Sequence, residues 1–323
     1  MARWMAVVML AAMLAGCGEP EQDGTAAVRV AAEDVGFLND NQAWRIERHS
    51  HLVQADGWTS LIGLHWLTLK THYIGSSPTS GLRLAIGPER LGMIQRVDGR
   101  VWLVPERGVD LRVDGQAVSG RVELRSDRDP SPTVVTYDEG RGAISLLARG
   151  HQQALRVRHA DAPTRAGFAG LDYWPAQRGW AVVARFEPHR PARTLEVVDM
   201  VGMASALANP GRLVFERDGR SHALEAIGNP DGSLLVILAD RTSGHGSYAA
   251  GRYIDVPALG ADGNVVLDFN RAYNPPCAFT PYATCPLPPA ENRLDLLIEA
   301  GEKAYRPAPA PAPAAAQAAE VSA

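Results

Sequence analysis

Residues 265–305, VVLDFNRAYNPPCAFTPYATCPLPPAENRLDLLIEAGEKAY, form the most distinctive segment of the chain. The segment begins with β-branched, aliphatic and aromatic residues around Asp268, a pattern that predicts a short buried strand. Pro275-Pro276 and the prolines of 286–289 then remove amide donors and fix φ, so that neither a helix nor a paired strand can continue. The sequence therefore predicts a strand followed by an ordered, irregular loop.

Polar side chains are concentrated in this loop and in residues 240–252. The strands that end near 240 and 268 flank one intervening strand, so their loops can share a rim. Held there, carboxylates, amides and arginines could serve recognition, a cation site or acid/base chemistry. They could equally satisfy the loop's own backbone, or form a structural network if Arg252 pairs with Asp240 or Asp268. The candidate polar site comprises Asp240, Thr242, Tyr248, Arg252, Asp268, Asn270, Arg271, Asn274, Glu291, Asn292 and Glu302.

The motifs of this region resemble a known family. They are DFNRAYNPPCAF at 268–279, CPLPP at 285–289, ENRL at 291–294 and AGEK at 300–303, with upstream pieces at 57–67 and 240–252. Together, over residues 40 to 305, they are similar to the bacterial and archaeal "domain of unknown function 1684" family. This resemblance implies no activity, because the family has no established one.

The N-terminus has the features of an export signal. Arg3 precedes an apolar run from Trp4 to Leu14, which is too short to span a bilayer but suits the core of a signal peptide. Leu14-Ala15-Gly16-Cys17 resembles the lipobox of bacterial lipoproteins, and this resemblance implies a lipidated Cys17. The alternative is an ordinary cleaved leader with a chance cysteine. Gly18 resembles the pattern of lipoproteins sorted to the outer membrane, so we expect a lipid anchor there that faces the periplasm, although the inner membrane stays open.

Two cysteines remain once Cys17 carries lipid. Cys277 and Cys285 would then be an even pair in an oxidising compartment, where a disulfide is the default. The alternative is a catalytic thiol or a metal pair, which is disfavoured because no histidine follows His245.

The hydrophobic pattern predicts a mainly β protein of two packed antiparallel β units, sandwich-like or barrel-like, with a short N-terminal helix. Short apolar runs are separated by Asp98-Gly99, Asp114-Gly115, Arg141-Gly142 and Asp218-Gly219, which are typical of hairpin turns. The first unit is faintly similar to forkhead-associated sandwiches. The predicted segments are a signal peptide (1–16), a tether (17–37), the helix and first β unit (38–160), a linker (161–179), the second β unit with the loop (180–305) and a disordered Pro/Ala tail (306–323).

The net charge and the absence of familiar motifs exclude several classes of function. The net charge of −4 offers no basic field for nucleic acid. Nucleophile-elbow, phosphate-loop, dinucleotide and zinc-protease motifs are absent from the sequence, so no cofactor or metal is predicted. The leading hypothesis is a non-catalytic envelope binding or structural module whose loop at 268–293 recognises a small ligand or an envelope component. The alternative is a hydrolase or other enzyme with an acid/base pair around Asp240 and Asp268, assisted by Glu291.

Overall fold

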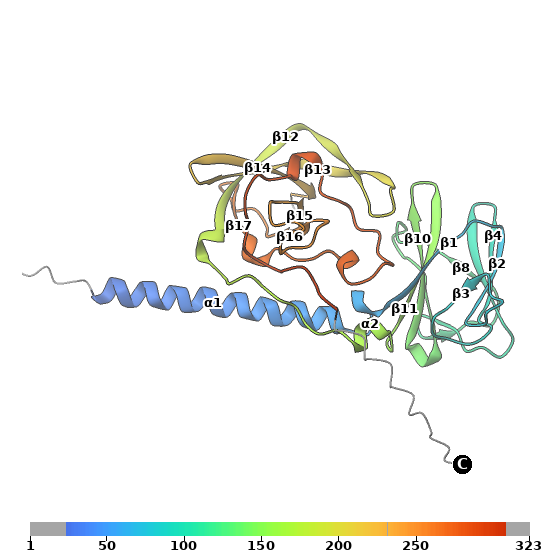
Figure 1. Ribbon diagram of the computed structural model, residues 1–323. Helices are drawn as coiled ribbons and strands as arrows, with labels where there is room; N and C mark the ends of the chain where they lie inside the picture. The colour runs from blue at the N-terminus through green and yellow to red at the C-terminus, as the bar shows by residue number, and fades with distance from the viewer. Residues whose placement is uncertain (1–23, 231, 308–323) are drawn as a thin grey trace, which may run out of the picture.

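The computed structural model describes residues 24–230 and 232–307, with side chains described from residue 34 onward (Figure 1). The predicted signal peptide, Cys17 and nearly all of the predicted tail lie outside these residues. Within them the protein is mainly β, with three sheets that are antiparallel except for the β2–β3 pair. The predicted fold class is confirmed.

The N-terminal helix α1 spans Gly24–Val53 and runs along the second β unit toward the first (Figure 1). It is longer than predicted and occupies part of the segment expected to be a tether. The reason lies in residues 25–35, which are alanine-rich and contain neither glycine nor proline. Its C-terminal half is anchored by buried side chains such as Asn41 and Leu52. Among the described residues, no helix is both long and apolar enough to cross a membrane.

The first β unit is a sandwich of two sheets. The strands are β1 (Leu61–Trp66), β2 (Thr71–Gly75), β3 (Leu82–Arg83), β4 (Gly92–Val97), β5 (Arg100–Pro105), β6 (Arg112–Val113), β7 (Gln116–Ala117), β8 (Val122–Leu124), β9 (Val134–Tyr137), β10 (Gly142–Arg149) and β11 (Gln152–His159). One sheet has the order β1-β11-β10-β9-β6-β7 and the other β3-β2-β4-β5-β8. Alternate residues such as Ile94, Leu103, Ile144 and Leu155 fill the core between them.

The turn signals are largely confirmed. Asp98-Gly99 joins β4 to β5 and Asp114-Gly115 joins β6 to β7, with positive φ at all four residues, as a two-residue hairpin turn requires. The turn predicted at Arg141-Gly142 is wrong, because the chain turns at 138–140 and Gly142 already belongs to β10. A Cβ on Gly142 would lie only 2.2 Å from the Tyr137 ring, so this glycine permits close packing.

The second β unit is a meander that curls into a half-barrel. After α2 (Pro163–Ala166) and a 3₁₀ turn η3 (Arg178–Trp180) come β12 (Ala181–Val198), β13 (Ala204–Arg217), β14 (Arg220–Gly228), β15 (Leu234–Leu238), β16 (Arg252–Val256) and β17 (Asn264–Asp268). The order is β16-β15-β14-β13-β12-β17, so β17 returns to pair with β12. Residues such as Leu213, Val236, Ile254 and Leu267 form its core.

The segment after β17 is the predicted irregular loop, drawn in orange and red in Figure 1. Its regular structure is limited to the 3₁₀ turns η4 (Phe269–Arg271), η5 (Pro276–Ala278) and η6 (Ala290–Asn292). The loop is fixed to the half-barrel by backbone hydrogen bonds, including Leu294 N to Ala239 O at 2.8 Å and Arg241 N to Leu296 O at 2.9 Å. It therefore packs directly against the turn that begins at Asp240.

Candidate functional site

A buried ion pair lies where β15 ends and β16 begins. Arg252 Nη2 is 2.9 Å from Asp240 Oδ2, and each side chain is 1% exposed. The other carboxylate oxygen of Asp240 accepts hydrogen bonds from the Thr242 hydroxyl at 2.6 Å and the Thr242 amide at 3.1 Å. Arg252 also donates to the carbonyls of Ile298, at 3.0 Å, and Ala300. Asp240 is thus fully occupied, and the pair ties residues 298–300 to the end of the sheet.

Burial governs the electrostatics of this pair. Desolvation lowers the pKa of Arg252, and the adjacent Asp240 carboxylate acts in the opposite direction. An isolated guanidinium at this depth would be costly, so its carboxylate partner and two carbonyls are needed to hold it. The arrangement is the structural network that was one alternative for the candidate site.

Glu302 is the centre of a second network. Its Oε1 accepts from Arg48 Nε at 2.8 Å and its Oε2 from the Asn274 amide at 2.7 Å, while Arg48 Nη2 donates to the Asn274 carbonyl at 2.8 Å. Arg48 lies 4.6 Å from the centre of the Tyr273 ring. Burial raises the pKa of Glu302, against the opposing effect of Arg48. Because Arg48 belongs to α1, this network joins the first helix to the last loop, a contact that sequence reasoning missed.

The side-chain amides of two buried asparagines form hydrogen bonds with backbone groups, in the way that a neighbouring strand would. Asn270 accepts from the Gln177 amide and donates to the Gln177 carbonyl, both at 2.9 Å. Asn292 does the same with Glu225, at 2.7 Å and 2.9 Å. Asp268 accepts from the Asn270 amide at 2.9 Å and caps the 3₁₀ turn that follows it. These side chains satisfy backbone groups of an irregular segment.

The remaining predicted residues lie near the surface. Arg271 and Glu291 are exposed, and Arg271 Nε is 3.5 Å from an Asp268 oxygen. The Tyr248 hydroxyl donates to the Cys277 carbonyl at 3.1 Å. Within the described chain, no hydrogen bond or ion pair joins Asp240 to Asp268. The structure therefore brings Asp240, Thr242 and Arg252 together, and Asn274 with Glu302, whereas Asp240 and Asp268 have different hydrogen-bond partners.

The two cysteines are neighbours without being bonded. Both are free thiols, and the Cys277 amide donates to Cys285 Sγ at 3.1 Å. The hydrogen bond from Cys285 lowers the pKa of Cys277, and the same contact raises the pKa of Cys285. The predicted disulfide is thus not formed in this structure, because the fold supplies the proximity whereas the bond also requires an oxidant. It stays a prediction for the oxidised protein.

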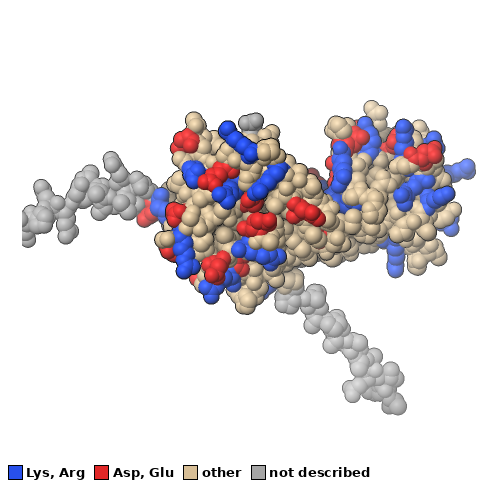
Figure 2. Space-filling view, turned by 90° about the horizontal axis from the view of Figure 1, so that it is seen from above, with Lys and Arg blue, Asp and Glu red and all other residues tan. Residues whose placement is uncertain are grey.

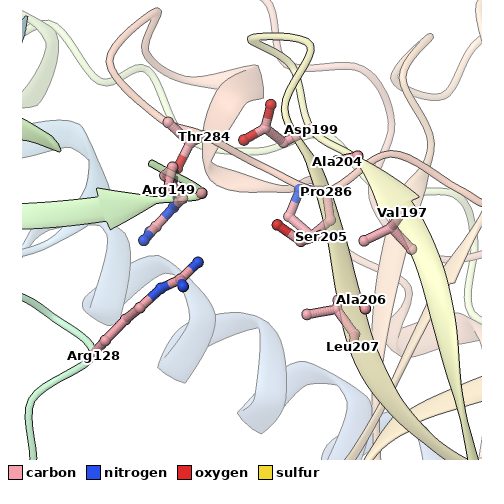
Figure 3. Close-up of a pocket in the computed structure, with 11 residues that line it drawn as sticks. Arg128, Arg149, Val197, Asp199, Ala204, Ser205, Ala206, Leu207, Thr284 and Pro286 are labelled. Atoms are coloured by element: carbon pink, nitrogen blue, oxygen red, sulfur yellow. Dashed lines mark hydrogen bonds between the residues drawn. The ribbon is translucent and has the colours of Figure 1, made fainter. Parts of the chain in front are cut away.

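A cleft of about 620 Å³ lies between the two β units (Figure 3). One wall carries Arg128 and Arg149 of the first unit, and the side chain of Arg128 extends into the space. The opposite wall is formed by small and apolar side chains of β12 and β13. It is completed by the irregular segment after β17, residues 269–305, which we call the signature loop. The second-unit lining residues are Val197, Asp199, Ala204, Ser205, Ala206, Leu207, Thr284 and Pro286.

The two arginines of the cleft differ in their partners. Arg149 Nη1 is 2.6 Å from an Asp127 oxygen, and Arg149 Nε donates to the Thr284 hydroxyl at 3.2 Å. Arg128 is exposed, and its guanidinium makes no ion pair with any described residue. Sequence reasoning missed this site, because its walls come from distant segments that carry no shared motif.

A second groove, of about 420 Å³, lies between α1 and the second unit. It is lined by rings that include Trp44, Trp58, Tyr253 and Tyr273, with Arg48 beside them. In the part of the chain that the structure describes, no three His, Cys, Asp or Glu side chains gather as potential metal ligands.

Comparisons with known proteins agree with the sequence resemblance. The family described as "Protein of unknown function (DUF1684)" matches residues 166–303, which contain every residue of the candidate polar site. Among solved structures, the chain is similar to the solution NMR structure of an uncharacterised protein from Haloarcula marismortui. The identity is 32% over 43% of this chain and 78% of that protein, with a TM-score of 0.37. The search of curated proteins found no significant match.

Proposed function

Since the chain belongs to the DUF1684 family, whose description names no activity, we propose a function from the geometry of the chain itself. We propose that it is a non-catalytic binding module of the cell envelope, anchored by lipid on Cys17 and facing the periplasm. Its ligand, a small molecule or an envelope component, binds in the cleft between the two β units. The signature loop forms part of the wall through Thr284 and Pro286.

The cleft is the observation that carries this proposal. Its volume of about 620 Å³ lies in the range typical of small-molecule sites, and it lies at a boundary between two units, where such sites are common. Its lining combines an apolar wall with a few polar groups, Arg128, Ser205 and Thr284 among them. Seen from above, a hollow separates the two lobes of the molecule (Figure 2). This arrangement supports recognition.

The state of the carboxylates favours binding over catalysis. A general acid or base must have an oxygen available to the substrate. In contrast, Asp240 is neutralised by Arg252 and Glu302 by Arg48, and all four side chains hold backbone segments in place. The alternative enzyme centred on Asp240 and Asp268 therefore has less support than the binding module.

The cleft proposal is tested by filling it. Ala206 and Ala208 lie on the same exposed face of β13, but only Ala206 lines the cleft. We expect peptidoglycan fragments, sugars or other envelope components, screened against the full-length chain, to include one that raises Tm, since a ligand at 100 times its Kd stabilises by about 2.7 kcal/mol. Ala206→Trp should abolish that shift and Ala208→Trp should retain it. An equal shift in both variants would place the ligand elsewhere and refute the cleft.

The anchor is tested separately at the N-terminus. The lipobox-like residues 14–17 support acylation, and several acyl chains hold a protein stably because each buried methylene contributes about 0.8 kcal/mol. Mass spectrometry of the mature protein should find a lipid-modified Cys17 as its first residue. Cys17→Ser should release the protein from the membrane fraction. An unmodified N-terminus at another residue would refute the anchor but leave the cleft untouched.

A further inference from the structure

Arg149, Arg156 and Arg158 form a row on one face of the first β unit. In β11, Leu155 is part of the buried core, so by strand alternation its neighbours Arg156 and Arg158 lie on the opposite face. Arg149 of β10 pairs with Gln152, which is on that same face. The three cationic side chains therefore share the outer surface of this sheet.

The row faces the boundary with the second unit. At one end Arg149 lines the cleft and donates to Thr284 of the signature loop at 3.2 Å. Toward the other end the guanidinium carbons of Arg156 and Arg158 lie 5.3 Å and 5.6 Å from the centre of the Trp58 ring. Trp58 in turn lines the groove beside α1. The row thus runs from one cavity toward the other.

Two of these cations lack an anionic partner. Arg149 is paired with Asp127, but neither Arg156 nor Arg158 forms an ion pair with any described residue. The Nε atoms of both are buried without a hydrogen-bond acceptor. Desolvation lowers the pKa of Arg156 to about 10; Arg158 and Arg149 add to this effect and Asp127 opposes it, so the charge of Arg156 is still present at neutral pH. Asp127 and Asp56 act on Arg156 and Arg158 only from beyond ion-pair distance, so this partly buried charge destabilises the fold on its own.

The contrast with the second unit is informative. There the buried Arg252 is matched by Asp240, and at the edge of that unit Arg48 of α1 is matched by Glu302. We propose that Arg156 and Arg158, with Arg149 beside them, form a binding site for a multiply charged oxyanion such as a phosphate group. The proposal deepens the proposed function, because the row lies at the same boundary between the units and so assigns an anionic group to the ligand.

The chemistry of the row fits this ligand. A guanidinium donates from a planar fork that matches the oxygens of a phosphate, and an oxyanion would supply the acceptors that the Nε atoms lack. Residues two apart on a strand are separated by about 6.6 Å, close enough for both forks to converge on one group. Trp58 orients both arginines from the side by cation–π contact.

The test compares thermal unfolding of the full-length chain in inorganic phosphate and in chloride at equal ionic strength. We expect a saturable rise in Tm with phosphate for the unmodified chain. Arg156→Met should weaken the apparent phosphate affinity by about tenfold or more, as loss of a charge-assisted contact does. In chloride the same variant should have a higher Tm than the unmodified chain, because it removes an unpaired cation. Arg158→Gln should also weaken phosphate binding and gives an independent variant.

The matched control is Arg121→Met. Arg121 also lies over a tryptophan, 4.3 Å from the ring centre of Trp102, and has no described carboxylate partner, but it is exposed. This variant should respond to phosphate like the unmodified chain. The proposal is overturned if neither inorganic phosphate nor a phosphate-bearing lipid raises Tm more than chloride does, or if Arg156→Met responds as the unmodified chain does. It is also overturned if Arg156→Met lowers Tm in chloride, as for an arginine with a purely structural role.

Two further arms separate the possible sources and the two proposals. Short-chain phosphatidylglycerol, used below its micelle concentration, tests a lipid head group as the source of the phosphate. If this lipid raises Tm in an Arg156-dependent way and inorganic phosphate does not, the ligand is a lipid phosphate and free phosphate is excluded. A neutral ligand that fills the cleft without any phosphate response would refute the oxyanion site alone. If phosphate raises Tm in an Arg156-dependent way but no ligand has a Tm shift that Ala206→Trp abolishes, the proposed ligand site in the cleft alone is refuted.

Discussion

Replacing Arg252 by methionine should remove a large fraction of the stability of the protein. The side chain is fully buried and holds the Asp240 carboxylate together with the carbonyls of Ile298 and Ala300. Without it, the carboxylate keeps its amide and hydroxyl donors but loses its counter-charge, and both carbonyls lose a donor. Removing one partner of a buried ion pair costs about 3–5 kcal/mol. Because domains are stable by only about 5–15 kcal/mol, we expect a marked loss.

Urea unfolding, followed by circular dichroism, measures this loss. The control is Arg271→Met, since Arg271 is 44% exposed and 3.5 Å from Asp268, and such surface pairs contribute about 0–1 kcal/mol. The double variant Arg252→Met with Asp240→Leu should recover much of the loss, because it leaves no unpaired charge. A loss below about 1 kcal/mol for Arg252→Met would refute the structural role of the ion pair and reopen a functional role for Asp240.

The other expectations concern pH, packing and redox state. Burial raises the pKa of Glu302 above its ordinary 4.5, so the contribution of Glu302 to the free energy of unfolding is present at low pH and is lost as pH rises through the raised pKa. Over that range the stability of the unmodified chain should fall relative to that of Glu302→Gln. A stability difference that does not change with pH would contradict this. Gly251 has φ +92° and an added Cβ would lie 2.5 Å from the Leu238 carbonyl oxygen, so Gly251→Ala should cost about 2 kcal/mol in urea unfolding, whereas an unchanged midpoint would argue against this packing. Oxidation should join Cys277 to Cys285 and add about 2.5 kcal/mol by the loop-entropy relation, and a Tm equal with and without reductant would count against the pair.

Much of the fold could be predicted from local patterns. Asp98-Gly99 and Asp114-Gly115 specify hairpin turns through backbone conformations that few other residues adopt. The prolines of the signature loop exclude regular structure by themselves. The same reasoning failed at Gly142, where the glycine accommodates the ring of Tyr137. A glycine required for packing has the same appearance in the sequence as one required for a turn.

The candidate site was harder to predict, because its chemistry depends on distant pairings. The sequence identified Asp240, Arg252 and Glu302 as important polar residues and included a structural network among the alternatives. It did not indicate Arg48 as the partner of Glu302, since side chains on different elements meet only through the tertiary fold. Nor did it separate Arg156 and Arg158 from other surface arginines, because alternation along β11 gives their face but does not show that they form no ion pair with the described residues.

The bond between Arg48 and Glu302 spans 254 positions of the chain. During synthesis the ribosome adds Arg48 of α1 254 residues before Glu302. Long-range contacts of this kind form slowly and only after the intervening chain exists. Arg48 of the nascent helix must therefore wait for this partner until the whole of both β units and the loop up to Glu302 have emerged from the ribosome.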